Sequence, residues 1–161
     1  MGKTTDAHIA KIESLSSICT RPTTAFSTAL IRAKAIHHDI AAAEQLMTSR
    51  HQAIFGNGTG QSVEKERAIT RDAQWIQANG KLEELGQIYE HHCLDSLNPA
   101  RASLRQGTTA LEKAIKEFET FVAAKEKGWF TSKKSVPAAR EAIRKGREYL
   151  GTLKTLVQLS A

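Results

Sequence analysis

The chain has few of the residues that interrupt helices or cross-link small folds. It contains three prolines and two cysteines in 161 residues, and aromatic residues make up 6%. Cys19 and Cys93 are too few for a disulfide framework, so we expect both to be reduced. Scarce proline and many Ala, Lys, Glu and Leu residues favour helix over sheet. The length suits one domain with its own core.

Long apolar runs are absent as well. The longest stretch without a charged residue, His51–Val63, has 13 residues and contains three glycines, so it is too short to span a bilayer. Charged residues at positions 6, 11 and 13 interrupt any apolar core of a signal peptide. We therefore expect a cytoplasmic protein, and export by a dedicated machine that needs no cleavable signal is the alternative.

Helical periodicity dominates what is present. Apolar residues recur at spacings of three and four, which is typical of helices buried on one side. Pro22 is expected at the start of a long helix, with Thr23 or Thr24 as its cap, and Asn98-Pro99 at the end of the next. Glycines from Gly56 onward end the first long helix. The expected helices are residues 23–55, 62–97, 100–127 and 136–159, after a shorter leading helix at 5–19.

These segments predict an all-α fold, a single domain over residues 1–161. The four long helices form an up-down-up-down four-helix bundle, and the leading helix packs across one end. The loops at 56–61 and 128–135 would then share one tip, with Arg21-Pro22 and Asn98-Pro99 at the other. His37 should lie opposite residue 80. Asn79-Gly80 is a weak point that we expect to stay helical. Small residues allow close helix approach at Ala33, Ala43, Ala78, Ala139, Gly80 and Gly146.

All of the excess positive charge lies in residues 125–161. That segment has nine basic and three acidic residues, whereas residues 1–124 are balanced, and the whole chain carries +6. A localised basic face attracts polyanions, and contacts to phosphates should be weakly sequence-specific. The predicted polyanion-binding residues are Lys127, Lys133, Lys134, Arg140, Arg144, Lys145 and Arg147. The alternative interpretation is a solvated helix face paired with Glu141 and Glu148.

Trp129 and Phe130 suggest a second kind of surface. They stand among lysines near a predicted tip, where aromatic side chains could enter a membrane interface while the lysines meet anionic headgroups. Trp129 also continues the apolar stripe of its helix, which makes Phe130 the better indicator. A membrane-surface module is therefore an alternative hypothesis.

The patterns that would indicate an enzyme or a metal site fail on spacing. Gln61 stands where a phosphate-binding loop needs its second glycine. His37, Glu44 and His51 share a stripe, but neighbours seven residues apart lie about 10 Å from each other. Cys19, Cys93 and His91 or His92 form a weak candidate for a zinc site. The histidine and Cys93 are close in sequence on one helix, where neighbouring side chains point in different directions, and this disfavours binding of one ion. No nucleophile–base pair stands out. We expect no catalysis, no cofactor, no metal and no small-molecule substrate.

The sequence thus predicts a non-catalytic helical binding or adaptor module. Its basic C-terminal hairpin would contact a nucleic-acid backbone or another polyanion within a larger assembly. A protein-interaction or oligomerisation bundle with no polyanion ligand is the first alternative, and the membrane-surface module is the second.

Overall fold

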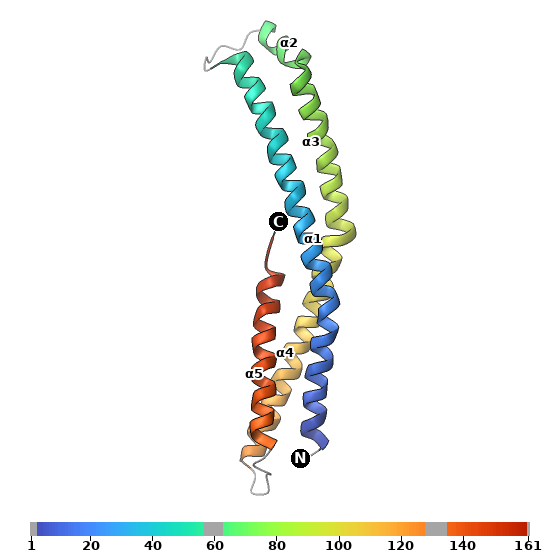
Figure 1. The fold of residues 1–161 in the computed structure, drawn as a ribbon, viewed down its shortest axis with the longest axis vertical. Helices are drawn as coiled ribbons and strands as arrows, with labels where there is room; N and C mark the ends of the chain where they lie inside the picture. Colours follow the sequence, from blue (N-terminus) through green and yellow to red (C-terminus); the bar gives the residue numbers. More distant parts are fainter. Residues whose placement is uncertain (1–2, 57–62, 128–134, 161) are drawn as a thin grey trace. The chain divides into compact units, whose positions relative to one another are not determined.

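In the computed structural model, residues 3–56, 63–127 and 135–160 are described, and all of their regular elements are helices. This confirms the predicted all-α class. The elements, drawn in Figure 1, are α1 Lys3–Phe55, α2 Val63–Arg71, α3 Ala73–His92, the five-residue π-helix η1 Cys93–Leu97, α4 Asn98–Glu126 and α5 Ser135–Val157.

The chain divides into two compact units. Unit 1 contains residues up to Thr28 together with Asn98–Ser160, and unit 2 contains Ala29–Leu97. Helix α1 contributes its first part to unit 1 and the remainder to unit 2. The up-down-up-down four-helix bundle is not confirmed, and the assignment of all residues to one domain stays a prediction.

The separate leading helix is a wrong prediction. Residues 5–19 and 23–55 belong to the single helix α1, and Pro22 lies inside it. A proline there removes one backbone hydrogen bond and crowds the carbonyl of Ile18, at a cost of about 3 kcal/mol. Thr24 caps nothing, because its hydroxyl donates to the carbonyl of Thr20 at 3.1 Å within the helix. The predicted turn at Arg21-Pro22 is therefore absent.

A buried stripe carries α1 through the proline. Thr5, Ile12, Cys19 and Phe26 are spaced seven residues apart, and each is at most 4% exposed. Ile18 lies off this stripe and is 59% exposed. The seven-residue spacing crosses Pro22 without a change of phase, so one continuous helix keeps all four side chains in the core of unit 1.

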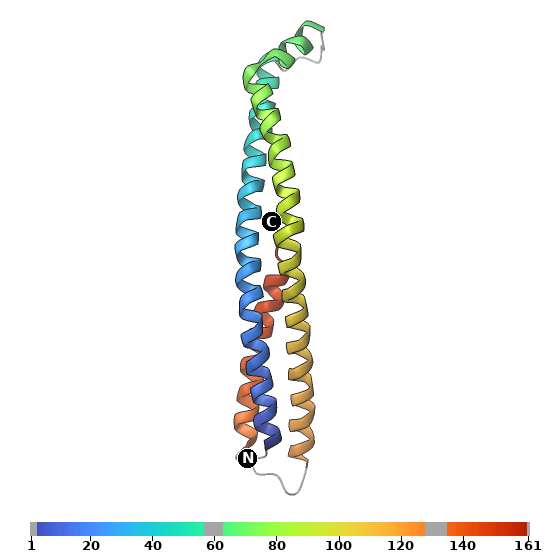
Figure 2. The same cartoon turned by 90° about the vertical axis from the view of Figure 1, so that its right-hand side faces the viewer.

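Unit 1 consists of three helices side by side, as Figures 1 and 2 show for the first part of α1 with α4 and α5. Lys125 at the end of α4 donates to the Thr5 hydroxyl at the start of α1, so these helices are antiparallel. Helices α1 and α5 run in the same direction, because Ile12 contacts Gly146 and Ser16 contacts Tyr149. The other large buried side chains are Leu104, Leu111, Ile115, Phe118, Val122, Leu150, Leu153 and Val157.

Close approach of α1 and α4 occurs at a glycine. A Cβ atom at Gly107 would lie 2.8 Å from the sulfur of Cys19, closer than carbon and sulfur can pack. Cys19 is fully buried, and burial raises the pKa of its thiol. The glycine is thus what lets the buried thiol fit between the two helices.

Unit 2 pairs the second part of α1 with α2, α3 and η1. The His37 ring packs edge-on against Tyr89 with the ring centroids 4.4 Å apart, and His92 Nε2 lies 2.7 Å from the Ala29 carbonyl oxygen. The predicted register, with His37 opposite residue 80, is therefore wrong. Of the predicted small seam residues, Ala33, Ala43 and Ala78 are buried here, and Ala139 and Gly146 in unit 1, but Gly80 is exposed.

The predicted helix 62–97 breaks at Asp72, which the sequence analysis missed, while Asn79-Gly80 stays helical as expected. Asp72 has an extended backbone, and its carboxylate accepts a hydrogen bond from the Trp75 N–H at 2.8 Å, which caps α3. Arg50 of α1 donates to both carboxylate oxygens, at 3.1 Å from Nε and 2.6 Å from Nη2. These bonds hold the pKa of Asp72 below its ordinary value.

The expected turn at Asn98-Pro99 is also absent. The π-helix η1 leads into α4 without a non-helical residue, and Pro99 occupies the first turn of α4, where its missing N–H is tolerated. The prediction that the loops at 56–61 and 128–135 share one tip depended on turns at Pro22 and Pro99. Because both turns are absent, that prediction is no longer supported. Gly56, with φ of 67°, ends α1 as predicted. Residues 57–61 and 128–134 of the two predicted loops lie outside the described residues.

We expect Gly107→Ala to destabilise the protein by about 1–3 kcal/mol, because the added methyl group overpacks the Cys19 contact. Gly86→Ala is the matched control. A Cβ there meets no atom within 4 Å, so the change should stabilise α3 by up to about 1 kcal/mol. Thermal denaturation of both variants and of Gly107→Ala with Cys19→Ala tests the cause. A double variant no more stable than Gly107→Ala would contradict it.

We expect Asp72→Asn to lower Tm at pH 7 by about 2–4 °C and to speed amide exchange at Trp75. A carboxyl with a lowered folded pKa stabilises the fold above its ordinary value of about 3.9, and this contribution is lost as the pH falls through the lowered pKa. The gap between variant and wild type should therefore close at acidic pH. A gap that stays constant down to pH 2 would contradict the role given to the charge.

Candidate functional site

The basic residues of α5 face a row of glutamates on α4. Both rows have a seven-residue spacing and run in opposite directions along the antiparallel helices, so each base meets one acid. Lys154 Nζ lies 2.8 Å from Glu112 Oε1. The other two pairs are Arg147 with Glu119 and Arg140 with Glu126. We call these three interhelical pairs the α4–α5 charge ladder.

Arg144 is paired within its own helix. Its guanidinium lies 2.7 Å from Glu141 and 3.1 Å from Glu148, one turn away on either side. Hydrogen bonding to Glu141 raises the pKa of Arg144 above its ordinary value and lowers that of Glu141. This is the pairing that the alternative interpretation of the basic face expected.

Four of the nine basic residues in 125–161 are thus paired with acids in space. Arg140, Arg144, Arg147 and Lys154 contact acids on α4 or on α5 itself, and the three acids on α4 are Glu112, Glu119 and Glu126. Two of these glutamates belong to the segment that the sequence counts as neutral. A phosphate group approaching this face would have to compete with a carboxylate at each arginine.

The remaining predicted polyanion-binding residues have different surroundings. Lys127 and Lys145 are exposed, and neither forms an ion pair within the part of the chain that the structure describes. Lys133 and Lys134 lie outside the described residues, as do Trp129 and Phe130 of the membrane hypothesis. Both the polyanion site and the membrane tip stay predictions.

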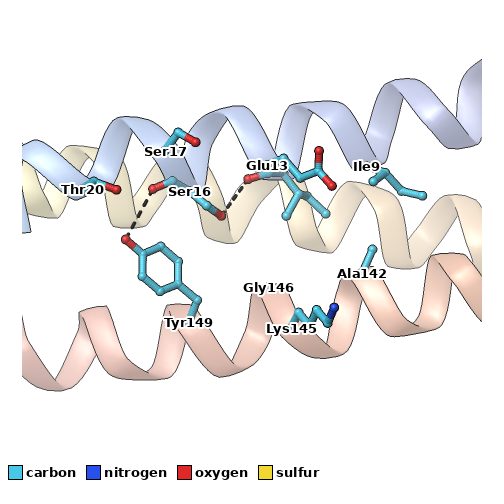
Figure 3. A pocket seen from close by; sticks show the side chains of 10 residues that line it. Ile9, Glu13, Ser16, Ser17, Thr20, Ala142, Lys145, Gly146 and Tyr149 are labelled. Atoms are coloured by element: carbon cyan, nitrogen blue, oxygen red, sulfur yellow. Dashed lines mark hydrogen bonds between the residues drawn. The ribbon is translucent and has the colours of Figure 1, made fainter.

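A groove lies between α1 and α5 on the surface of unit 1 (Figure 3). It has a volume of about 490 Å³, and its lining is mostly apolar. Ile9 and Ile12 of α1 and Ala142 and Gly146 of α5 contribute the apolar part, while Glu13 stands on the α1 wall and Lys145 on the α5 wall. The groove is open along its length, so it suits an elongated ligand better than an enclosed substrate.

Two contacts fix the width of this groove. The Tyr149 hydroxyl donates to the backbone carbonyl of Ser16 at 3.4 Å, which joins the two walls (Figure 3). A Cβ atom at Gly146 would lie 3.1 Å from Ile115 and 3.3 Å from Ile12, so α5 sits closer to its neighbours than a residue with a side chain ordinarily packs. The groove is therefore built by core packing and does not depend on a loop.

The sequence analysis missed this groove. Because Pro22 was expected at the start of a separate long helix and residues 5–19 were expected to form a short helix across one end, residues 9–20 were not considered as a wall beside α5. The available signal was the seven-residue spacing through the proline, which places α1 along unit 1 and so beside the face of α5 that carries Ala142 and Tyr149.

The described residues contain no group of three or more His, Cys, Asp or Glu side chains placed to hold a metal ion. None of the described helices is both long and apolar enough to cross a membrane. No protein-family model, curated protein or solved structure matches the chain. The arguments for function therefore rest on the groove and on the charged surfaces.

We expect Arg147→Glu to lower Tm by about 2–4 °C, because it puts two carboxylates opposite each other in the α4–α5 charge ladder. Combining it with Glu119→Arg restores an opposite pair and should recover most of the loss. The loss should also shrink in 1 M NaCl, where exposed charges are screened. Melting curves of the two single variants and the swap decide this, and equal losses in all three would contradict the pairing.

Proposed function

We propose that the chain is a non-catalytic binding module that holds a helix of a protein partner in the α1–α5 groove of unit 1. The observation that carries this proposal is the groove itself, an open and mostly apolar surface between two parallel helices. Amphipathic helices bind such grooves through apolar residues at intervals of three and four.

Helix direction supports the same proposal. In an up-down bundle each helix is antiparallel to its neighbours, and in unit 1 this holds for the pairs that α4 forms with α1 and with α5. The parallel pair α1 and α5 is the exception. A partner helix running antiparallel to both would give unit 1 four helices of alternating direction, which is the arrangement the sequence predicted for this chain alone.

Binding of a polyanion is the second candidate. The observation that favours it is the exposure of Lys127 and Lys145 without ion pairs among the described residues, together with the overall charge of +6. The α4–α5 charge ladder argues for the protein partner instead, because it occupies the bases that would otherwise meet phosphates.

A photo-crosslinking amino acid at Ser17, on the α1 wall of the groove, tests the protein-partner proposal in cells that naturally make the chain. The matched control position is Lys113, which is exposed on α4. We expect a discrete adduct from position 17 and none from 113, with mass spectrometry giving the identity of the bound protein. Equal labelling from both positions, or none from position 17, would reject the groove as the binding site.

Salt dependence separates the two candidates. Binding to labelled DNA and RNA duplexes should be weak and should change little with salt if the ladder arginines stay paired. Neutralisation of phosphates by all seven predicted bases would instead give a slope of about −6 for log affinity against log salt concentration. A slope that steep, reduced by Arg140→Gln and Arg147→Gln, would favour the polyanion over the protein partner. Anionic vesicles in the same series test the membrane hypothesis.

A further inference from the structure

We infer that unit 2 is a dimerisation surface, on which the second part of α1 and helix α3 pack against the same two helices of a second copy of this chain. The contact is made at a groove between α1 and α3 with a volume of about 300 Å³. This α1–α3 groove shares no residue with the α1–α5 groove. Its apolar surface, the charges on its walls and the direction of its helices carry the inference.

Unit 2 leaves more apolar surface exposed than unit 1 does. Of the seven large apolar side chains that are exposed among the described residues, five belong to unit 2, which are Ile31, Leu46, Val63, Ile76 and Leu94. Two helices side by side can bury only the faces that they turn toward each other, and a helix with two neighbours needs a wider apolar face.

Helix α1 has such a wider face in unit 2. One apolar stripe, which includes Ile36 and Ala43, is buried. A second stripe is exposed, and its members are spaced four, seven and four residues apart, so they share one face of the helix. They are Ile31, Ala35, Ala42 and Leu46. The second stripe is what a helix with one more neighbour would carry.

The α1–α3 groove lies along this exposed stripe. Ala42 and Leu46 line its α1 wall, and the buried Ala43 and Ala78 line it as well. Small side chains at these positions let the backbone of another helix come close, while Leu46, which is 44% exposed, supplies apolar contact.

The two walls of the groove carry opposite charges. Asp39 stands on the α1 wall and Lys81 on the α3 wall, and both are exposed. Neither belongs to an ion pair within residues 3–56, 63–127 and 135–160, whereas Arg50 and Asp72 of the same unit are paired. A surface with one acidic and one basic wall is complementary to itself if symmetry places each wall on the opposite one.

A two-fold axis parallel to the helices gives this arrangement. The axis runs in front of the groove, midway between α1 and α3. A half-turn about it exchanges the two sides without changing the level along the helices, so the partner's α1 covers α3 and the partner's α3 covers α1. No helix of the second copy then occupies the place of a helix of the first. Asp39 faces the partner subunit's Lys81, and Lys81 faces the partner subunit's Asp39.

Helix direction agrees with the same axis. Helices α1 and α3 are antiparallel, because Ala29 near the start of unit 2 contacts His92, while Arg50 further along α1 bonds to Asp72 just before α3. An axis parallel to the helices leaves their directions unchanged, so the partner's α1 is antiparallel to the α3 that it covers. All neighbouring helices of the resulting four-helix bundle are thus antiparallel, as in an up-down bundle.

Charge reversal on the full chain tests the inference. Asp39→Lys places like charges at both contacts of the dimer, and Lys81→Asp does the same with the opposite sign. Sedimentation across a micromolar concentration series should show a self-association that each variant weakens at least tenfold. An equimolar mixture of the two variants should associate again, because both contacts of the mixed dimer then join a basic residue to an acidic one. The double variant should behave as the wild type.

The matched controls are Glu83→Lys and Lys34→Asp, which make comparable charge changes at exposed sites of unit 2 outside the groove. They should associate as the wild type does. Melting curves identify any charge variant that fails to fold.

A second pair of variants tests the surface without changing any charge. Ala41 and Ala42 are both exposed on α1, and only Ala42 lines the groove. Ala42→Gln puts a longer side chain where the partner's helix must come close, so it should weaken self-association at least tenfold. Ala41→Gln should leave it unchanged.

A wild type that stays monomeric throughout the series would overturn the inference. A self-association that Asp39→Lys and Ala42→Gln leave unchanged, or that the control variants weaken equally, would also overturn it. These outcomes do not decide the proposed function, because the crosslinker at Ser17 reports on the α1–α5 groove. An adduct from position 17 with a different protein would support that proposal even if the chain were monomeric.

Discussion

The burial of one face of α1 against α4 and α5 is the constraint on which unit 1 depends. Phe26 is fully buried and has the Arg101 guanidinium 5.0 Å from its ring centroid, and Arg101 also donates to the carbonyl of Val157 near the end of α5. Burying Phe26 and Ile12 contributes about 1.5–3 kcal/mol each. Together they match or exceed the roughly 3 kcal/mol that Pro22 costs inside the helix, so packing, and not local propensity, carries α1 through the proline.

Much of the helix content follows from the sequence, because stripes such as Leu104 to Val122 repeat over several turns. The errors have physical causes. Pro22 was interpreted from its local preference alone, as the start of a new helix. Buried residues at the same phase on both sides of it keep the helix continuous. The break at Asp72 depends on Arg50, which lies 22 residues away in sequence. No local pattern contains that pair, so the start of α3 and the register of unit 2 could not be predicted.

At the candidate site, the distribution of charge along the sequence differs from its distribution in space. The sequence places every excess positive charge after residue 124, yet antiparallel packing of α4 on α5 brings glutamates beside those bases. The ladder could have been predicted from the seven-residue spacing of Glu112, Glu119 and Glu126 against Arg140, Arg147 and Lys154. The groove depended on a weaker signal, the seven-residue spacing that continues through Pro22, because predicting it requires knowing that α1 stays helical past the proline and runs beside α5.

The contact at Gly146 has a consequence for how α5 chooses its position along unit 1. The charge ladder penalises a shift of α5 by one turn, but a shift by seven residues would still join two of the three pairs. Such a shift would bring Ala139 or Leu153 to the place of Gly146, where even a Cβ atom lies within 3.3 Å of Ile12 and Ile115. Charge therefore disfavours the small errors of alignment, and the missing side chain of Gly146 disfavours the large one.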